Sequence, residues 1–190
     1  MEQLMKKTQS TFGYTDYEMA RIRYVLTGLF YDFSKLIILA FFFYCTGHII
    51  HFTFAIVPLF LLRTKLGGLH CPTYLSCLIT TFLYLYAAIY ILPNNLSLHP
   101  LVVYALLLIC AITCYLIGPN SLTRKIPKNI IYEKTAKLKS FQLILIITIC
   151  IFIFSPTDHL IVSFWTIVLH TVQLFISKII KEVKENAQCT

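Results

Sequence analysis

The chain has 190 residues, of which 58% are hydrophobic and 13% are charged, and its formal net charge is +8. This apolar content is too high for an ordinary soluble domain, in which about 45–50% of residues are apolar. The basic residues gather between apolar runs, so membrane topology and anionic lipid head groups explain the charge better than nucleic acid does. We expect no nucleic-acid partner.

Several long apolar runs predict an all-α, polytopic integral membrane protein with about six membrane segments, built as a single membrane domain over residues 1–190. The sequence lacks the alternating segments of about ten residues that mark an outer-membrane β-barrel. Of the seven cysteines, four lie inside apolar runs, where a thiol behaves as a small hydrophobic side chain. The cysteines therefore do not predict a disulfide framework.

Residues 1–35 are predicted to form an interfacial region. Apolar side chains recur at helical spacing over residues 17–35 and charged side chains fall on the other side. That pattern is typical of an amphipathic helix lying on the cytoplasmic leaflet. The first 20 residues have neither an apolar core nor a cleavage site, so no signal peptide is predicted.

Residues 36–62 form an apolar stretch that is long for one membrane span and short for two. The basic loop at residues 120–140 and the basic N-terminus are both predicted to be cytoplasmic, so this stretch has to cross the membrane an even number of times. A short hairpin that turns near Gly47 and His48 meets that requirement. The alternative is a single span with the N-terminus outside.

Four further spans are predicted over residues 73–92, 101–118, 141–154 and 159–177. The connection at residues 93–100 carries no Lys or Arg and is predicted to lie outside, whereas the charged tail at residues 178–190 is predicted to be cytoplasmic. Both termini are therefore expected on the cytoplasmic side. Residues 78–177 then hold the remaining membrane helices.

The sequence LLRTKLGGLHCPTYLSC brings two glycines, a histidine, a proline and a cysteine together at the start of a predicted span. In one continuous helix His70 and Cys77 would lie about 10 Å apart, which is too far for proton transfer. Gly67 and Gly68 permit a sharp turn or a close backbone approach, and Pro72 suits the first position of a helix. A loop folded back in this way would bring the imidazole beside the thiol.

We therefore interpret residues 63–77 as a catalytic loop and helix start. The positive end of the helix favours a thiolate at Cys77, and an imidazolium at His70 would favour it further. Such a pair is typical of thiol nucleophiles in acyl transfer. The alternative is that Cys77 only packs against its neighbours.

A spaced motif, R-x-K-x-GG-x-H-x6-C, is formed by Arg63, Lys65, Gly67, Gly68, His70 and Cys77. It follows a short apolar hairpin and precedes four spans with a lysine-rich loop between the second and third. This arrangement resembles the accessory gene regulator protein B family over nearly the whole chain. The sequence departs from the family at Cys71, where a small residue is usual, and at Thr64 and Lys65, where a second arginine is often found.

The resemblance implies a membrane-embedded cysteine endopeptidase of the bacterial plasma membrane that processes the precursor of a quorum-sensing peptide. It implies that His70 and Cys77 are the catalytic pair. It also implies that an internal cysteine or serine of the precursor displaces Cys77 and closes a thiolactone or lactone ring. The expected alternative function is a non-catalytic peptide exporter or channel, although few intramembrane polar residues are present to line a pathway.

The predicted substrate-binding residues are Arg63, Lys65, Lys134, Lys137 and Lys139. Their positive charge suits the acidic C-terminal tail of a short precursor peptide and suits anionic membrane lipids equally well. We expect these two partners, with a homodimer as an open alternative, and we expect no cofactor and no metal. His170 lies within the last predicted span, where a helix–helix hydrogen bond is the expected role.

Overall fold

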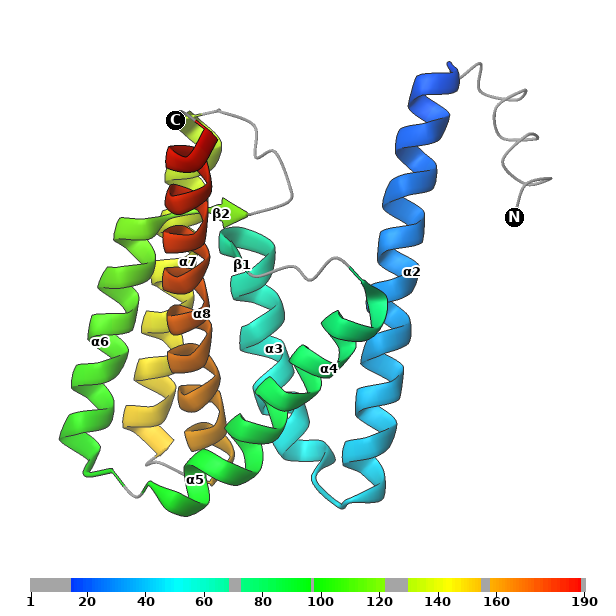
Figure 1. Ribbon diagram of the computed structural model, residues 1–190. Coiled ribbons are helices and arrows are strands. Elements are labelled where there is room, and N and C mark those ends of the chain that lie inside the picture. The colour runs from blue at the N-terminus through cyan, green and yellow to red at the C-terminus, as the bar shows by residue number, and fades with distance from the viewer. Residues whose placement is uncertain (1–14, 69–72, 97, 122–129, 155–157, 189–190) are drawn as a thin grey trace. The chain divides into compact units, whose positions relative to one another are not determined.

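The computed structural model describes residues 15–68, 73–96, 98–121, 130–154 and 158–188 (Figure 1). The described residues form helices, short connections and two strands of two residues each. They fall into two compact units, Met1–Cys45 and Thr46–Thr190.

The first unit contains α2 (Asp16–Cys45). A capping box begins this helix: the Thr15 N–H donates to Glu18 Oε2 at 3.0 Å, and the Glu18 N–H donates to the Thr15 hydroxyl at 3.4 Å. The backbone hydrogen bond from Thr15 holds the pKa of the Glu18 carboxyl below its ordinary value. These bonds satisfy amide groups that the first helical turn would otherwise leave unpaired.

Helix α2 runs without a break past residue 36, where we predicted the boundary between an interfacial helix and the first span. The segment long and apolar enough to cross a membrane is Leu26–Cys45, so this predicted boundary was wrong. No proline interrupts the stretch. Its charged residues Asp32 and Lys35 form an ion pair at 3.1 Å, which lowers the cost of holding them within an apolar segment.

The second unit is built from α3 (Ile49–Leu66), α4 (Tyr74–Tyr86), the π-helix η1 (Ala87–Ile91), α5 (Leu92–Asn95), α6 (Pro100–Ile117), α7 (Ile130–Phe154) and α8 (Asp158–Gln188). Across the described residues of both units, six helical segments are long and apolar enough to cross a membrane. The predicted all-α, multi-pass fold and its number of segments are confirmed. A turn at Thr46 and Gly47 separates α2 from α3, close to the predicted turning point.

Helix α8 is the most buried helix of the second unit. It packs against α3 and α6, and α7 packs against the same two helices (Figure 1). Of the part of α8 that is apolar enough to cross a membrane, 56% is buried, whereas 22 to 33% is buried in the other membrane-length segments of this unit. Helix α4 runs at a slant to α3 and α8 and contacts α3.

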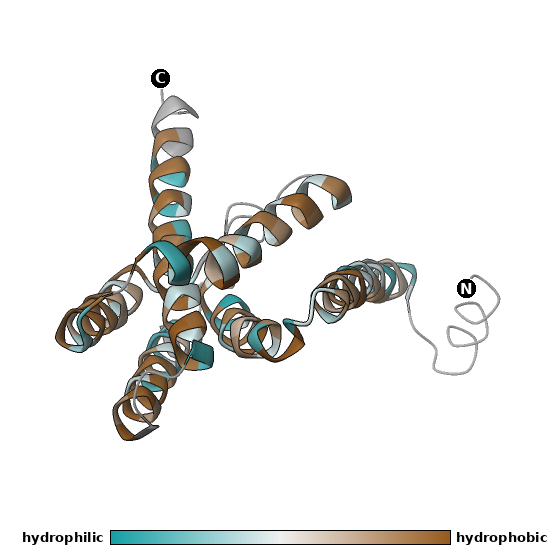
Figure 2. Ribbon diagram, turned by 90° about the horizontal axis from the view of Figure 1, so that it is seen from below, coloured by the Kyte–Doolittle hydropathy of each residue, from teal (hydrophilic) through white to brown (hydrophobic). Residues whose placement is uncertain are grey.

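The outer surface of these helices is apolar. Figure 2 shows hydrophobic residues over the greater part of each helix, and large side chains such as Leu101, Leu116 and Phe152 are exposed. Exposed apolar side chains in such numbers suit a lipid environment, in contrast to the small apolar patches of soluble proteins.

Two predicted boundaries were wrong because helices extend into segments that we took as loop or tail. Helix α7 begins at Ile130, so the second half of the basic loop at residues 120–140 is helical, and Lys137 pairs with Glu133 one turn earlier at 2.7 Å. Helix α8 continues through most of the predicted tail, to Gln188. In both segments the basic residues alternate with good helix formers, and the positive charge alone suggested a loop.

Candidate active site

The glycine pair ends α3 and brings two distant connections together. The Gly67 N–H donates to the Arg63 carbonyl, and its backbone angles, φ 80° and ψ −147°, are strained for any residue with a side chain. Strand β1 (Gly67–Gly68) pairs in parallel with β2 (Asn120–Ser121), which follows α6. Of the two roles predicted for these glycines, the structure shows the close backbone approach.

The second glycine also lies against α8. A Cβ placed on Gly68 would lie 3.7 Å from Gln173 Oε1 and 3.9 Å from His170 Cε1. A side chain at this position would therefore be in ordinary van der Waals contact with two polar side chains of the central helix. Chain segments about 100 residues apart in sequence meet at this point.

The start of α4 positions Cys77. Thr73 is the N-cap, and its hydroxyl accepts a hydrogen bond from the Ser76 N–H at 3.3 Å. Thr73 has an extended backbone, so Tyr74 takes the first helical position and the prediction that Pro72 takes it was wrong. The Cys77 N–H donates to the Thr73 carbonyl at 3.1 Å, which places the thiol at the end of the first helical turn, and Cys77 is only 6% exposed.

The predicted partner of Cys77 falls in the connection just before this helix. His70, Cys71 and Pro72 lie outside the described residues. The expectation that His70 approaches Cys77 therefore stays a prediction.

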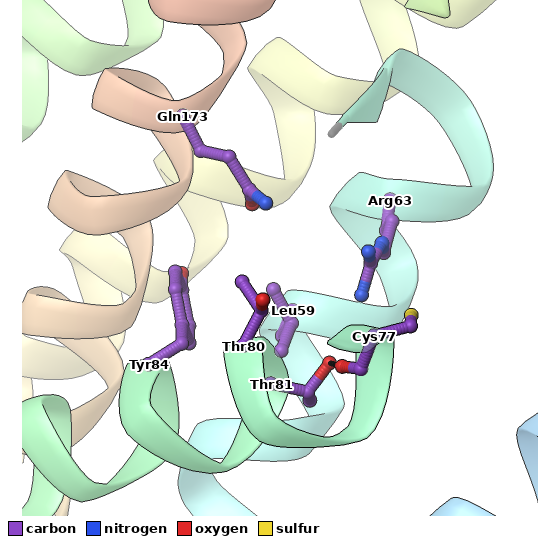
Figure 3. Close-up of a pocket in the computed structure, with 7 residues that line it drawn as sticks. All are labelled: Leu59, Arg63, Cys77, Thr80, Thr81, Tyr84 and Gln173. Carbon is purple, nitrogen blue, oxygen red and sulfur yellow. Dashed lines mark hydrogen bonds between the residues drawn. The ribbon is translucent and has the colours of Figure 1, made fainter. Parts of the chain in front are cut away.

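A small cleft lies beside Cys77. Its walls come from α3, α4 and α8. It is lined by Leu59, Arg63, Cys77, Thr80, Thr81, Tyr84 and Gln173. Figure 3 shows Arg63 reaching from α3 toward the end of α4 that carries Cys77, while Gln173 enters from α8.

The hydroxyl groups of the cleft are engaged with backbone carbonyls. Thr80 donates to the Ser76 carbonyl at 2.7 Å and Thr81 donates to the Cys77 carbonyl at 2.8 Å. The Tyr84 hydroxyl donates to the Thr166 carbonyl of α8 at 2.5 Å, which ties α4 to the central helix. These bonds fix the walls of the cleft, which also holds the thiol of Cys77, the guanidinium of Arg63 and the amide of Gln173.

Residues 1–176 match the family model described as Accessory gene regulator B. The chain belongs to this family. A similar curated protein is a putative AgrB-like protein of Clostridium beijerinckii, which is 37% identical over 67 residues, or 35% of this chain and 34% of that protein. The match thus spans about a third of the length of this relative. No solved structure matches the chain.

Family membership links the chain to accessory gene regulation by a quorum-sensing peptide. With six membrane-length helices among the described residues, this family member is a multi-pass membrane protein. The motif that carried the resemblance ends at Cys77, and this residue and Arg63 both line the cleft.

The structure places the predicted substrate-binding residues in two locations. Arg63 lies in the cleft and Lys65 lies half-buried near the end of α3. The three lysines of the basic loop lie instead on the first turns of α7. Of these, Lys137 is held by Glu133 and lies against Gly118, whereas Lys134 and Lys139 are exposed.

Sequence reasoning missed the contribution of α8 to the cleft. Polar residues recur along this helix at alternating spacings of three and four, at Ser163, Thr166, His170, Gln173 and Ser177. This spacing places them on one helix face, and four of the five are buried. The pattern was present in the sequence, although it does not say which helix the face meets. The helix–helix hydrogen bond predicted for His170 is not found, since neither ring nitrogen has a partner among the described residues.

Proposed function

We propose that this protein is a membrane-embedded cysteine endopeptidase that cleaves the C-terminal tail from a short autoinducing-peptide precursor. One observation carries the proposal: in a member of this family, Cys77 lies buried in the first turn of a helix, in a cleft shared with Arg63. A helix start favours the thiolate form of a cysteine.

The reaction begins with transfer of the Cys77 thiol proton to His70. The thiolate then attacks the scissile carbonyl carbon, and the C–N bond breaks as the imidazolium returns the proton to the leaving amine. The products are a thioester on Cys77 and the free C-terminal tail. An internal thiol or hydroxyl of the precursor next displaces Cys77, which closes a thiolactone or lactone ring and restores the thiol.

Thioester exchange conserves the energy of the acyl bond, so the ring closes without a further energy source. Water would compete for the same thioester. With Cys77 only 6% exposed, the site restricts the access of water to the bond, which favours cyclisation over hydrolysis.

The proposed partners are the precursor peptide, through its acidic tail, and anionic lipids. Arg63 and Lys65 at the end of α3 supply positive charge near the cleft, and the lysines of α7 supply more. We place both termini, and with them the cleft, on the cytoplasmic side, where a precursor is synthesised. A homodimer remains an open alternative.

The test is precursor cleavage in cells that express cysteine variants. Cys77→Ala is expected to abolish cleavage with normal membrane insertion, while Cys71→Ala keeps most activity. Cys150→Ala on α7 is a matched control, because this cysteine does not line the cleft. Full cleavage by Cys77→Ala would refute the peptidase, and continued release of peptide by that variant would favour an exporter.

A further inference from the structure

Three histidine rings lie in a row at the end of the second unit that is remote from the cleft. The ring centroids of His48 and His51 are 5.4 Å apart, and those of His51 and His159 are 4.6 Å apart. His48 is the N-cap of α3 and His159 is the second residue of α8, so the row joins the starts of these two helices. Arg63 and Gln173, which line the cleft, lie about three to four turns further along α3 and α8 (Figure 1).

The π-helix η1 is tied to the same row through Tyr90. The His48 Nδ1 lies 2.7 Å from the Thr46 carbonyl oxygen, which can only accept, so this nitrogen carries a proton and donates it. The Tyr90 hydroxyl oxygen lies 3.0 Å from the same nitrogen, and the two rings are 4.7 Å apart. Behind Tyr90 lies the ring of Tyr86 on α4, at 4.9 Å. A π-helix is a rare form that often marks a functional site, so the presence of one at this contact is a second indication of a role.

The surroundings of His159 suit a neutral ring. The three histidines are half-buried, and His159 stacks on Phe54 with ring centroids 5.6 Å apart. Its Nδ1 is buried and has no hydrogen-bond partner among the described residues. A neutral imidazole can leave this nitrogen without a proton, whereas an imidazolium has an N–H donor at both nitrogens. In the closed row that second donor would be buried without an acceptor, which costs free energy.

The charges around the row are unbalanced once its rings take up protons. Positive charges on His48 and His159 repel a positive charge on His51, and the carboxylate of Asp158 offsets part of this repulsion. Helix α5, with the sequence LPNN, and the last turn of α7, with the sequence IFIF, add no ionisable side chain. One carboxylate therefore stands against three imidazoles, so it can balance one positive charge but not two.

We propose that His48, His51 and His159 form a pH-sensitive latch. The latch holds the starts of α3 and α8 and the π-helix together while the rings are neutral, and it releases them when two neighbouring rings are protonated. Histidine is suited to this role because it ordinarily titrates between about pH 5 and pH 8. The distribution of Lys and Arg places this end of the helices on the outer side, so the latch responds to the external pH.

The direction of the response follows from the protons that each state binds. In the released state the rings are apart and each takes up a proton independently, whereas in the closed row neighbouring charges repel. The released state therefore binds more protons, so the closed state is favoured above about pH 7 and loses stability as the pH falls through about 6.5. Because α3, α4 and α8 also wall the cleft, release loosens the site. This last consequence rests on the proposed peptidase function.

The first experiment measures amide hydrogen exchange of the full-length protein in lipid nanodiscs at about pH 7.5 and about pH 5.5, which bracket the titration of histidine. Rates are corrected for the intrinsic effect of pH on exchange. In the wild type, the corrected rates of the peptides that contain the starts of α3 and α8 are expected to rise several-fold at the lower pH. His51→Phe keeps a ring in the middle of the row without a charge, and His159→Phe keeps a ring against Phe54. Both variants are expected to lose the response.

His99→Asn is the control. His99 is exposed at the N-cap of α6, where its Nδ1 accepts from the Leu101 N–H, and asparagine keeps an acceptor there while removing a ring that titrates. This variant is expected to respond as the wild type does. A wild type without a response, an equal response in both phenylalanine variants, or a lost response in His99→Asn would overturn the proposal.

The second experiment measures precursor cleavage in intact cells, whose cytoplasm stays near neutral while the medium is acidified. Acidification is expected to slow cleavage by the wild type and by His99→Asn, but not by His51→Phe. Equal slowing of the wild type and His51→Phe, or no slowing of the wild type, would overturn the link between the latch and the cleft. Precursor cleavage that survives Cys77→Ala would instead remove the peptidase function, and hydrogen exchange would still decide whether the latch exists.

Discussion

Gly67 has backbone angles that disfavour every other residue. With φ 80° and ψ −147°, an added side chain would collide with the adjacent backbone. The same residue caps α3 through Arg63 and pairs with Asn120 in the strand pair. A strained residue that both caps α3 and holds the strand pair is more sensitive to substitution than its small size suggests.

We predict that Gly67→Ala lowers the free energy of unfolding by roughly 1–3 kcal/mol, the cost of a residue held in this region. Denaturation of the purified protein in detergent measures the change. Gly28→Ala is the matched control: nothing lies within 4 Å of its added Cβ, and alanine favours a helix by up to about 1 kcal/mol. Similar losses in the two variants would show that the strain at Gly67 is not the cause.

Helix α7 carries the lysines that we expected in a loop. Lys134 and Lys139 are exposed on its first turns. Lys137 forms an ion pair with Glu133 at 2.7 Å and packs on Gly118. Because a helix fixes the positions of these lysines, each has its own surroundings and they are not equivalent. The structure separates two charges free to attract a partner from one that holds α7 against the end of α6.

Charge reversal at Lys134 and Lys139 is expected to raise the KM for an acidic precursor peptide several-fold with little change in kcat, because exposed charges act on encounter and binding. The difference from the wild type should shrink as salt increases, since screening weakens exposed charges. Lys137→Glu should instead lower stability, because it sets two acidic side chains one turn apart. A loss of kcat with unchanged KM at low salt would rule out recruitment by α7.

The sequence was a good guide to the elements and a poor one to their ends. Apolar runs predicted six segments because the membrane imposes a length on each. The predicted start of α7 and the predicted end of α8 were wrong. Lysine disfavours membrane insertion but favours a helix in water, so a lysine-rich segment ends a membrane span without ending the helix. The motif identified Arg63 and Cys77, whereas Gln173 joins them only through the packing of α8, which no local pattern specifies.

At the scale of the whole molecule, six spans place alternate connections on opposite sides of the membrane. Cysteines introduced at Thr64 and Thr135 in a background without reactive thiols should escape a membrane-impermeant thiol reagent applied to intact cells, whereas a cysteine at Asn95 should react. All three side chains are exposed in the structure. The expectation follows from the distribution of Lys and Arg along the chain.

Labelling at Thr64 without labelling at Thr135 would contradict six spans. The cleft would then open to the outside, and a precursor made in the cytoplasm could not reach it. That result would remove the proposed processing reaction while leaving family membership intact. As a control, the same reagent is applied to permeabilised cells, where each introduced cysteine should react.

The central position of α8 has a consequence for the synthesis and membrane insertion of the protein. The cleft is lined by Cys77 and by Gln173, which lies about 100 residues later in the chain. At about 5–20 residues per second, a ribosome needs roughly 5–20 s to make that stretch. Throughout this interval the nascent chain carries its thiol without the helix that completes the cleft. A chain that stops before α8 therefore enters the membrane without a finished site.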